Sequence, residues 1–228
     1  MPAKNVLKTY VEEGYYHLYN RGVEKRTIFQ DDQDYKVFLS YLKTYLEPPS
    51  PPKDRIVKLN EITFTALARP LKNFNQEITL LAYCFMPNHF HLLVKQKSAR
   101  SIESFTRSLL TKYSTYFNKR HQRVGSLFQG TYKAVLIDDE NYLLHLSRYI
   151  HLNPFENAKD TPLHSHYSSY GDYLDLRKTK WIDTSLILSF FKNTQKLHLK
   201  DILSYQSFVE DYPEDPKEIL GQLIMEET

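Results

Sequence analysis

Residues 78–94 read ITLLAYCFMPNHFHLLV and decide the fold. Two apolar runs flank Pro87-Asn88, a dipeptide typical of the centre of a tight turn, so the segment predicts a β-hairpin. His89 and His91 begin its second arm. Side chains two residues apart in a strand point to one face, so both imidazoles can bind one cation. Two ligands do not complete a metal site, and two polar residues on the open face of an antiparallel sheet are the alternative.

The segments around this hairpin predict the order strand, helix, hairpin, helix, strand, helix. The other expected elements are a strand at 15–19, a helix from the acidic turn 31–34 to the prolines at 48–49, a helix from 101 to about 118, a strand at 127–137 and a helix at 139–153. This order favours an α+β fold, with a ferredoxin-like antiparallel sheet and helices packed on one of its faces.

The remaining segments predict additions to a single main domain. The chain has 228 residues, enough to bury the core of one domain with an extension. Residues 48–76, which begin with a proline cluster, are charged and irregular and indicate a variable insertion or an edge hairpin. We therefore expect a main domain over 1–158 that contains this insertion, and a helical C-terminal extension with an acidic tail over 159–228.

Cysteine content and hydropathy bear on the cellular compartment. Cys84 is the one cysteine of the chain, so an intrachain disulfide is excluded and a reducing environment is expected. The first 14 residues lack an apolar signal core, and no stretch reaches the length of a membrane span. We expect a cytoplasmic protein with no membrane partner.

Charge is unevenly distributed, although the formal net charge is only +3. Residues 100–133 contain seven lysines and arginines and one acid, whereas residues 200–228 contain eight acids and two lysines. Tyrosines and phenylalanines alternate with the cations of the first segment. Cations between aromatic rings are typical of surfaces that bind single-stranded nucleic acid. The alternative is an ordinary solvated helix face.

The helix expected at 139–153 carries a second set of polar residues. Tyr142, His145, Tyr149 and Asn153 recur at helical spacing and share a face opposite the apolar one. A tyrosine, whose ordinary pKa is about 10, becomes a nucleophile when its developing charge is stabilised, which a divalent cation achieves. Asn153 offers an amide oxygen as a third ligand beside two imidazoles. Spacing alone does not connect this helix with the histidines.

Four motifs occur along the chain: YHLYNRG at 16–22, MPNHFHLLV at 86–94, GSLFQG at 125–130 and YIHLNP at 149–154. In combination they resemble the HUH single-tyrosine transposases, and more closely the REP-associated tyrosine transposase branch of that family. The resemblance implies a transposase that depends on Mg²⁺ or Mn²⁺. Such an enzyme cleaves and rejoins single-stranded DNA that carries imperfect palindromic hairpins, through a 5′-phosphotyrosine intermediate.

By motif position, the resemblance implies that His89, His91 and Asn153 ligate the metal and that Tyr149 is the nucleophile. It allows a monomer or a homodimer, and a DNA substrate implies a nucleoid-associated location. The candidates for DNA binding are Lys112, Lys119, Arg120, Arg123, Phe128, Gln129, Tyr132 and Lys133. Surface charge and core packing are the alternative roles for these residues.

Two other functions stay open on the sequence. A domesticated DNA-binding protein of the same fold would bind palindromes without cutting them. A zinc-dependent hydrolase would use the two histidines and would not need Tyr149.

Overall fold

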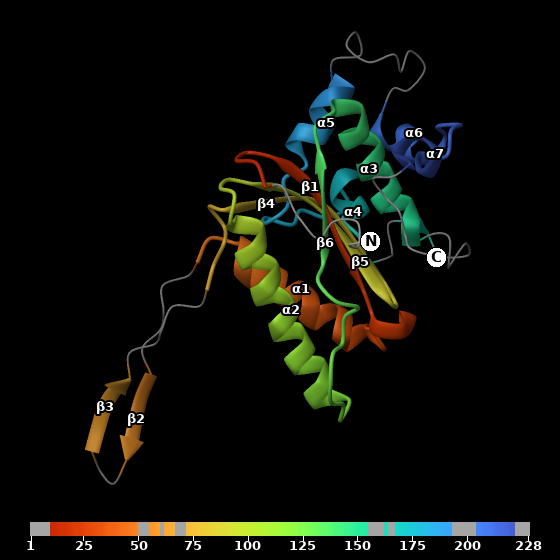
Figure 1. The fold of residues 1–228 in the computed structure, drawn as a ribbon. Coiled ribbons are helices and arrows are strands. Elements are labelled where there is room, and N and C mark those ends of the chain that lie inside the picture. The colour runs from red at the N-terminus through yellow and green to blue at the C-terminus, as the bar shows by residue number, and fades with distance from the viewer. Residues whose placement is uncertain are drawn as a thin grey trace.

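The computed structural model describes residues 10–49, 55–59, 62–66, 72–154, 162–163, 167–192 and 204–221. Its centre is a four-stranded antiparallel sheet with the strand order β4-β5-β1-β6. These strands are β1 (Tyr15–Arg21), β4 (Ile78–Met86), β5 (His89–Gln96) and β6 (Lys133–Ile137). A short 3-10 turn (Val23–Lys25) follows β1. Within the segment expected to be an insertion, β2 (Arg55–Leu59) and β3 (Ile62–Ala66) form a separate two-stranded sheet that projects away from the main one (Figure 1).

The hairpin predicted at 78–94 is present. β4 and β5 pair in antiparallel register from Ile78 with Gln96 to Met86 with His89, and Pro87 and Asn88 form the turn between them. Eight of the nine residues of β4 are buried. Strands read as nearly continuous apolar runs when both faces of their sheet are covered.

Helices do cover both faces of this sheet (Figure 1). On one face α1 (Asp32–Leu46) and α2 (Ser101–Arg120) bury a core that includes Leu18 and Leu92 of the sheet. On the other face α3 (Glu140–Leu152) packs on Leu93 and Ile137. The predicted α+β class and antiparallel sheet are confirmed. The expectation that the helices lie on one face holds for α1 and α2 but not for α3, because a single helical layer would leave one apolar side of β4 and β5 in water.

Among the described residues after α3, four short helices follow. They are α4 (Tyr170–Tyr173), α5 (Ser185–Lys192), α6 (Tyr205–Glu210) and α7 (Pro216–Leu220). Ile187, Tyr205 and Phe208 of these helices share the core that α3 forms with the sheet. In the described part of the chain, no helix is long and apolar enough to cross a membrane. α3 is therefore enclosed between the sheet and the C-terminal helices.

Candidate active site

Three histidines gather on the sheet face that α3 covers. The rings of His89 and His91 in β5 have centroids 5.0 Å apart. In the neighbouring strand β1, Nε2 of His17 lies 2.8 Å from Nδ1 of His91. β1 pairs Tyr19 with His91, so His17 is the diagonal neighbour of His91 on the same face. The two histidines predicted from the sequence thus share a face, and a third imidazole joins them.

A hydrogen bond determines which nitrogen of the His89 ring carries the proton. Nδ1 of His89 lies 2.6 Å from Oδ1 of Asn88. An amide oxygen only accepts, so in the neutral ring of His89 the proton is on Nδ1 and the lone pair is on Nε2. If Nδ1 of His91 likewise donates to His17, the lone pair of His91 is also on Nε2. Both rings then present the nitrogen that binds a cation.

Burial keeps His91 in the form that ligates metals. His17 and His91 are both fully buried. Burial, followed by the positive charges that His17 and His89 would carry, holds the pKa of His91 well below its ordinary value. A neutral imidazole is the form that binds a cation. The donor set of the two histidines therefore fits a divalent metal ion.

Tyr149 of α3 lies against these histidines. Its ring centroid is 5.4 Å from that of His91 and 6.3 Å from that of His17, and both contacts are edge-on. Tyr149 is 2% exposed. The sequence placed it on a polar face of the helix, but α3 is buried on all sides from Leu143 to His151 because the sheet and the C-terminal helices enclose it. The fold thus connects the helix with the histidines within one chain.

Asn153 lies one turn beyond Tyr149, at the C-cap of α3. It is buried, and with Tyr149 it lines a cavity of about 300 Å³ between α3 and residues 212–217. Neither His89 nor His91 lines that cavity. Among the described residues, no group of three His, Cys, Asp or Glu side chains is placed to hold a metal. A third ligand would therefore come from an amide such as Asn153, from water or from the substrate.

The other polar residues of α3 face the C-terminal helices. His145 packs on the rings of Phe208 and Tyr212, and burial lowers the pKa of His145 to about 4. His151 lies 2.7 Å from both the Tyr205 hydroxyl and the Ser169 hydroxyl. These two histidines hold the C-terminal helices on α3 and do not face His91.

The predicted DNA-binding cations fall into two groups. In the first, the ammonium of Lys112 lies over the Tyr41 ring at 4.5 Å, and Arg120 pairs with the carboxylates of Asp31 and Asp34 at 2.6 and 2.5 Å. The hydrogen bond with Arg120 lowers the pKa of Asp31 to about 2. These two cations are engaged by neighbouring side chains, which no local sequence pattern reveals.

The second group lies around the end of α2 and the start of β6. Lys119 is exposed, while Arg123 and Lys133 are half-buried, and Arg123 donates to Oδ1 of Asn118. Gln129 is exposed, and its backbone N–H donates to the carbonyl of Arg21 at 2.8 Å. That bond joins the segment before β6 to the end of β1. These residues therefore lie close to Phe128 and Tyr132, the two aromatic candidates of the same stretch of chain.

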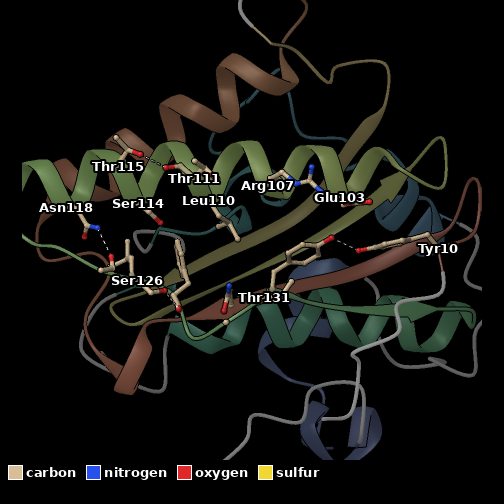
Figure 2. A pocket seen from close by; sticks show the side chains of 16 residues that line it. Tyr10, Glu103, Arg107, Leu110, Thr111, Ser114, Thr115, Asn118, Ser126 and Thr131 are labelled. Carbon is tan, nitrogen blue, oxygen red and sulfur yellow. Dashed lines mark hydrogen bonds and ion pairs between the residues drawn. The ribbon is translucent and has the colours of Figure 1, made fainter. Parts of the chain in front are cut away.

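Phe128 and Tyr132 line a groove of about 800 Å³ between α2 and residues 125–132 (Figure 2). Both side chains are buried in its walls. The hydroxyl groups of Tyr132 and Tyr10 are 2.5 Å apart. The strand expected at 127–137 begins only at Lys133, because Phe128 makes an isolated bridge to Gly22 and the chain then follows the groove.

Sequence reasoning missed His17 as part of the candidate active site. The signal was present in the motif at 16–22, where His17 and Tyr19 alternate with Tyr16 and Leu18 as expected for a strand with two different faces. The motif could not show which strand pairs with β5. That pairing, and therefore the contact of His17 with His91, is fixed by the fold.

The sequence resemblance predicted that the helix bearing Tyr149 lies against the strand bearing His89 and His91, and the structure places Tyr149 beside His91 in this way. The family described as "Transposase IS200 like" matches residues 59–153. The predicted resemblance to the single-tyrosine transposases agrees with this match.

One solved structure extends the likeness beyond the matched segment. It is described as "Structure of the REP associates tyrosine transposase bound to a REP hairpin", and it aligns with a TM-score of 0.51 and 13% sequence identity. The alignment covers 80% of this chain and 93% of that chain. At this identity the likeness concerns the fold. No curated protein matches the chain significantly.

Proposed function

We propose that the protein is a metal-dependent single-stranded DNA endonuclease and transposase, which cleaves and rejoins hairpin-bearing palindromic DNA through a 5′-phosphotyrosine intermediate. The observation that carries this proposal is the contact between the Tyr149 and His91 rings, whose centroids are 5.4 Å apart. The segment matched by the transposase family contains His89, His91, Tyr149 and Asn153. The solved structure of similar fold is described as bound to a REP hairpin, which supports DNA as the partner.

In this proposal Tyr149 is the nucleophile. Its phenol oxygen attacks the phosphorus of a DNA phosphodiester and loses its proton to water, while the bond between phosphorus and the 3′ oxygen breaks and that oxygen takes up a proton from water. The products are a 5′-phosphotyrosine and a free 3′-hydroxyl, and attack by such a hydroxyl reverses the step. Because Tyr149 is buried, a phenolate there is unfavourable without a neighbouring positive charge.

His89 and His91 would hold Mg²⁺ or Mn²⁺ through Nε2, with Asn153 as a proposed third ligand. When bound, the cation polarises the phosphate oxygens and stabilises the charge that develops on them. Asn88 and His17 bond the Nδ1 atoms of His89 and His91 and so orient both rings, and the bond to Asn88 also fixes the tautomer of His89. Two imidazoles and an amide are neutral donors, which suit Mn²⁺ better than Mg²⁺.

The same geometry favours a monomer that contains a whole site. Tyr149 contacts the histidines of its own chain, and the C-terminal helices enclose α3 from the other side. We take residues 1–158 as the catalytic domain and 159–228 as an extension that holds α3 in place. A DNA substrate would bring the protein to the nucleoid.

For the DNA surface we propose direct contacts from the polar and charged residues around the end of α2 and the start of β6, together with the groove beside them. The residues are Lys119, Arg123, Gln129 and Lys133, with Phe128 and Tyr132 in the groove wall. Lys112 and Arg120 would support this surface from within, since their charges are engaged by Tyr41 and by Asp31 and Asp34.

The test is a Tyr149→Phe variant, which removes only the nucleophilic oxygen. Wild-type protein is incubated with a labelled hairpin oligonucleotide and Mn²⁺, and a covalent adduct is sought on a denaturing gel. We expect an adduct with the wild type and none with Tyr149→Phe. The matched control is Tyr142→Phe, because Tyr142 lies on the same helix but is 39% exposed. An adduct formed by Tyr149→Phe would refute the assignment, and hairpin binding without cleavage in any metal would favour the non-cleaving palindrome-binding protein.

A further inference from the structure

The groove between α2 and residues 125–132 has the dimensions of a small-molecule site. Its volume of about 800 Å³ lies within the range of natural ligand pockets. Leu110, Thr111 and Ser114 of α2 line one side, and Ser126 and Thr131 lie across from them (Figure 2). The groove opens on the sheet face that carries α1 and α2, away from the histidines.

Asn20 in the groove lining has an unsatisfied amide donor. Asn20 belongs to β1 and is only 4% exposed. Its Oδ1 accepts a hydrogen bond from the backbone N–H of Arg21 at 2.9 Å. Its Nδ2 has no hydrogen-bond partner within the part of the chain that the structure describes. A buried donor without a partner costs free energy, and a bound ligand with a hydrogen-bond acceptor at this position would remove that cost.

The chemistry of the lining favours a nucleobase over a phosphate. Besides Asn20 the walls present hydroxyl groups, the Asn118 amide and the apolar surfaces of Leu110, Leu127 and Phe128. The two charged residues of the lining, Glu103 and Arg107, form an ion pair with each other. A phosphate would need uncompensated cations, whereas a base is neutral, with flat apolar faces and polar edges.

The groove and the candidate active site meet at the same end of β1. Asn20 precedes Arg21, which pairs with His89 in the register of β1 and β5. Successive side chains of a strand point to opposite faces. Asn20 therefore reaches the groove on one face of the sheet, while His17 reaches His91 on the other.

We infer that this groove binds one unpaired nucleobase of the single-stranded DNA substrate, and that Nδ2 of Asn20 donates a hydrogen bond to an acceptor on that base. This inference rests on the proposed function, since it assumes a DNA substrate. The acceptors available are the carbonyl oxygens of pyrimidines and guanine and the ring nitrogens of purines. Asn20 would thereby hold the base that occupies the groove.

The experiment measures hairpin binding without cleavage, by fluorescence anisotropy in EDTA at fixed salt. A set of hairpin oligonucleotides carries a single abasic site at each unpaired position in turn. We expect one position at which the abasic site weakens wild-type binding about 10-fold or more. An Asn20→Asp variant, which removes the donor at nearly constant shape, should bind the intact oligonucleotide about 10-fold more weakly and lose little more at that abasic position. Asn141→Asp is the matched control, because Asn141 is exposed on α3, and it should bind as the wild type does.

A second variant keeps the test decisive if Asn20→Asp does not fold. Ser114→Leu fills the groove from α2 without altering the sheet, and it should abolish the effect of the same abasic site. If the hairpin binds and is cleaved but no abasic position depends on Asn20 or Ser114, the groove inference is wrong and the proposed function stands. If no single-stranded or hairpin DNA binds, both are wrong.

Discussion

Replacing Arg148 by methionine should destabilise the protein by roughly 3 kcal/mol and release the C-terminal helices from α3. The guanidinium donates to three backbone carbonyls, those of Val209 at 3.2 Å, Tyr212 at 2.9 Å and Glu214 at 2.7 Å. The bond to Val209 is buried, so its loss leaves an unsatisfied carbonyl that costs about 1–3 kcal/mol. Water can replace the other two, which are partly exposed, at about 0.5–1.5 kcal/mol each.

Two further effects reduce the loss expected for Arg148→Met. Burial lowers the pKa of Arg148, because the charged guanidinium is partly removed from water. Methionine carries no charge and avoids this desolvation cost, which offsets part of the stability lost with the hydrogen bonds. The guanidinium also lies over the Tyr212 ring at 5.4 Å, and methionine retains the apolar part of this packing. The net estimate of roughly 3 kcal/mol therefore lies below the sum of the three bonds taken at their upper limits.

The assay is urea unfolding at pH 7, with Arg107→Met as the matched control. Arg107 pairs with Glu103 on the exposed side of α2, and a surface ion pair contributes only about 0–1 kcal/mol. Because Arg148 precedes Tyr149, the rate of adduct formation with hairpin DNA should also fall in Arg148→Met. If Arg148→Met lowers the free energy of unfolding by less than about 1 kcal/mol, or if the control lowers it equally, Arg148 does not hold the C-terminal helices on α3.

Two other predictions concern histidines. His17→Phe should weaken Mn²⁺ binding about 10- to 100-fold in calorimetric titration, because His91 loses the hydrogen bond that orients it. His17→Gln, which can still hydrogen-bond, should restore part of the affinity. An unchanged affinity in His17→Phe would show that His17 does not orient a ligand. His151 has its pKa lowered to about 3, mainly by burial and then by the charge of Arg177. The unfolded chain therefore takes up the proton first as pH falls below about 6.5, and stability should drop by roughly 2 kcal/mol between pH 7 and pH 5. His151→Gln should flatten that pH dependence in urea unfolding, and an equally steep profile in the variant would assign the effect to other groups.

The sequence was sufficient where the information is local. The hairpin at 78–94 follows from two apolar runs around Pro87-Asn88, and the helix at 139–153 begins at Asp139, whose side chain accepts from the Tyr142 backbone as an N-cap should. Periodicity also indicated that His89 and His91 share a face, and their ring contact agrees with this. These features depend on residues within one or two turns of chain.

The sequence was insufficient where a contact joins distant segments. Arg120 lies in a basic stretch that predicts phosphate contacts, yet it pairs with Asp31 and Asp34, which are more than 80 residues away. Phe128 and Tyr132 line a groove, but the Asn20 donor in that groove comes from β1. Local periodicity cannot indicate which strand lies beside which, and one residue of register decides which face a side chain occupies.

The register of β1 makes the two candidate sites separable by mutation. His17 and Asn20 are three residues apart, an odd number, so a straight strand must direct them to opposite faces. His17 contacts His91 beside Tyr149, whereas Asn20 lines the groove beside α2. A change at His17 should then alter metal affinity and leave the effect of the abasic site on hairpin binding intact, and a change at Asn20 should do the reverse. If either variant altered both properties, the two faces of the sheet would be coupled through β1. The assignment of His17 to the metal site alone and of Asn20 to the groove alone would then be wrong.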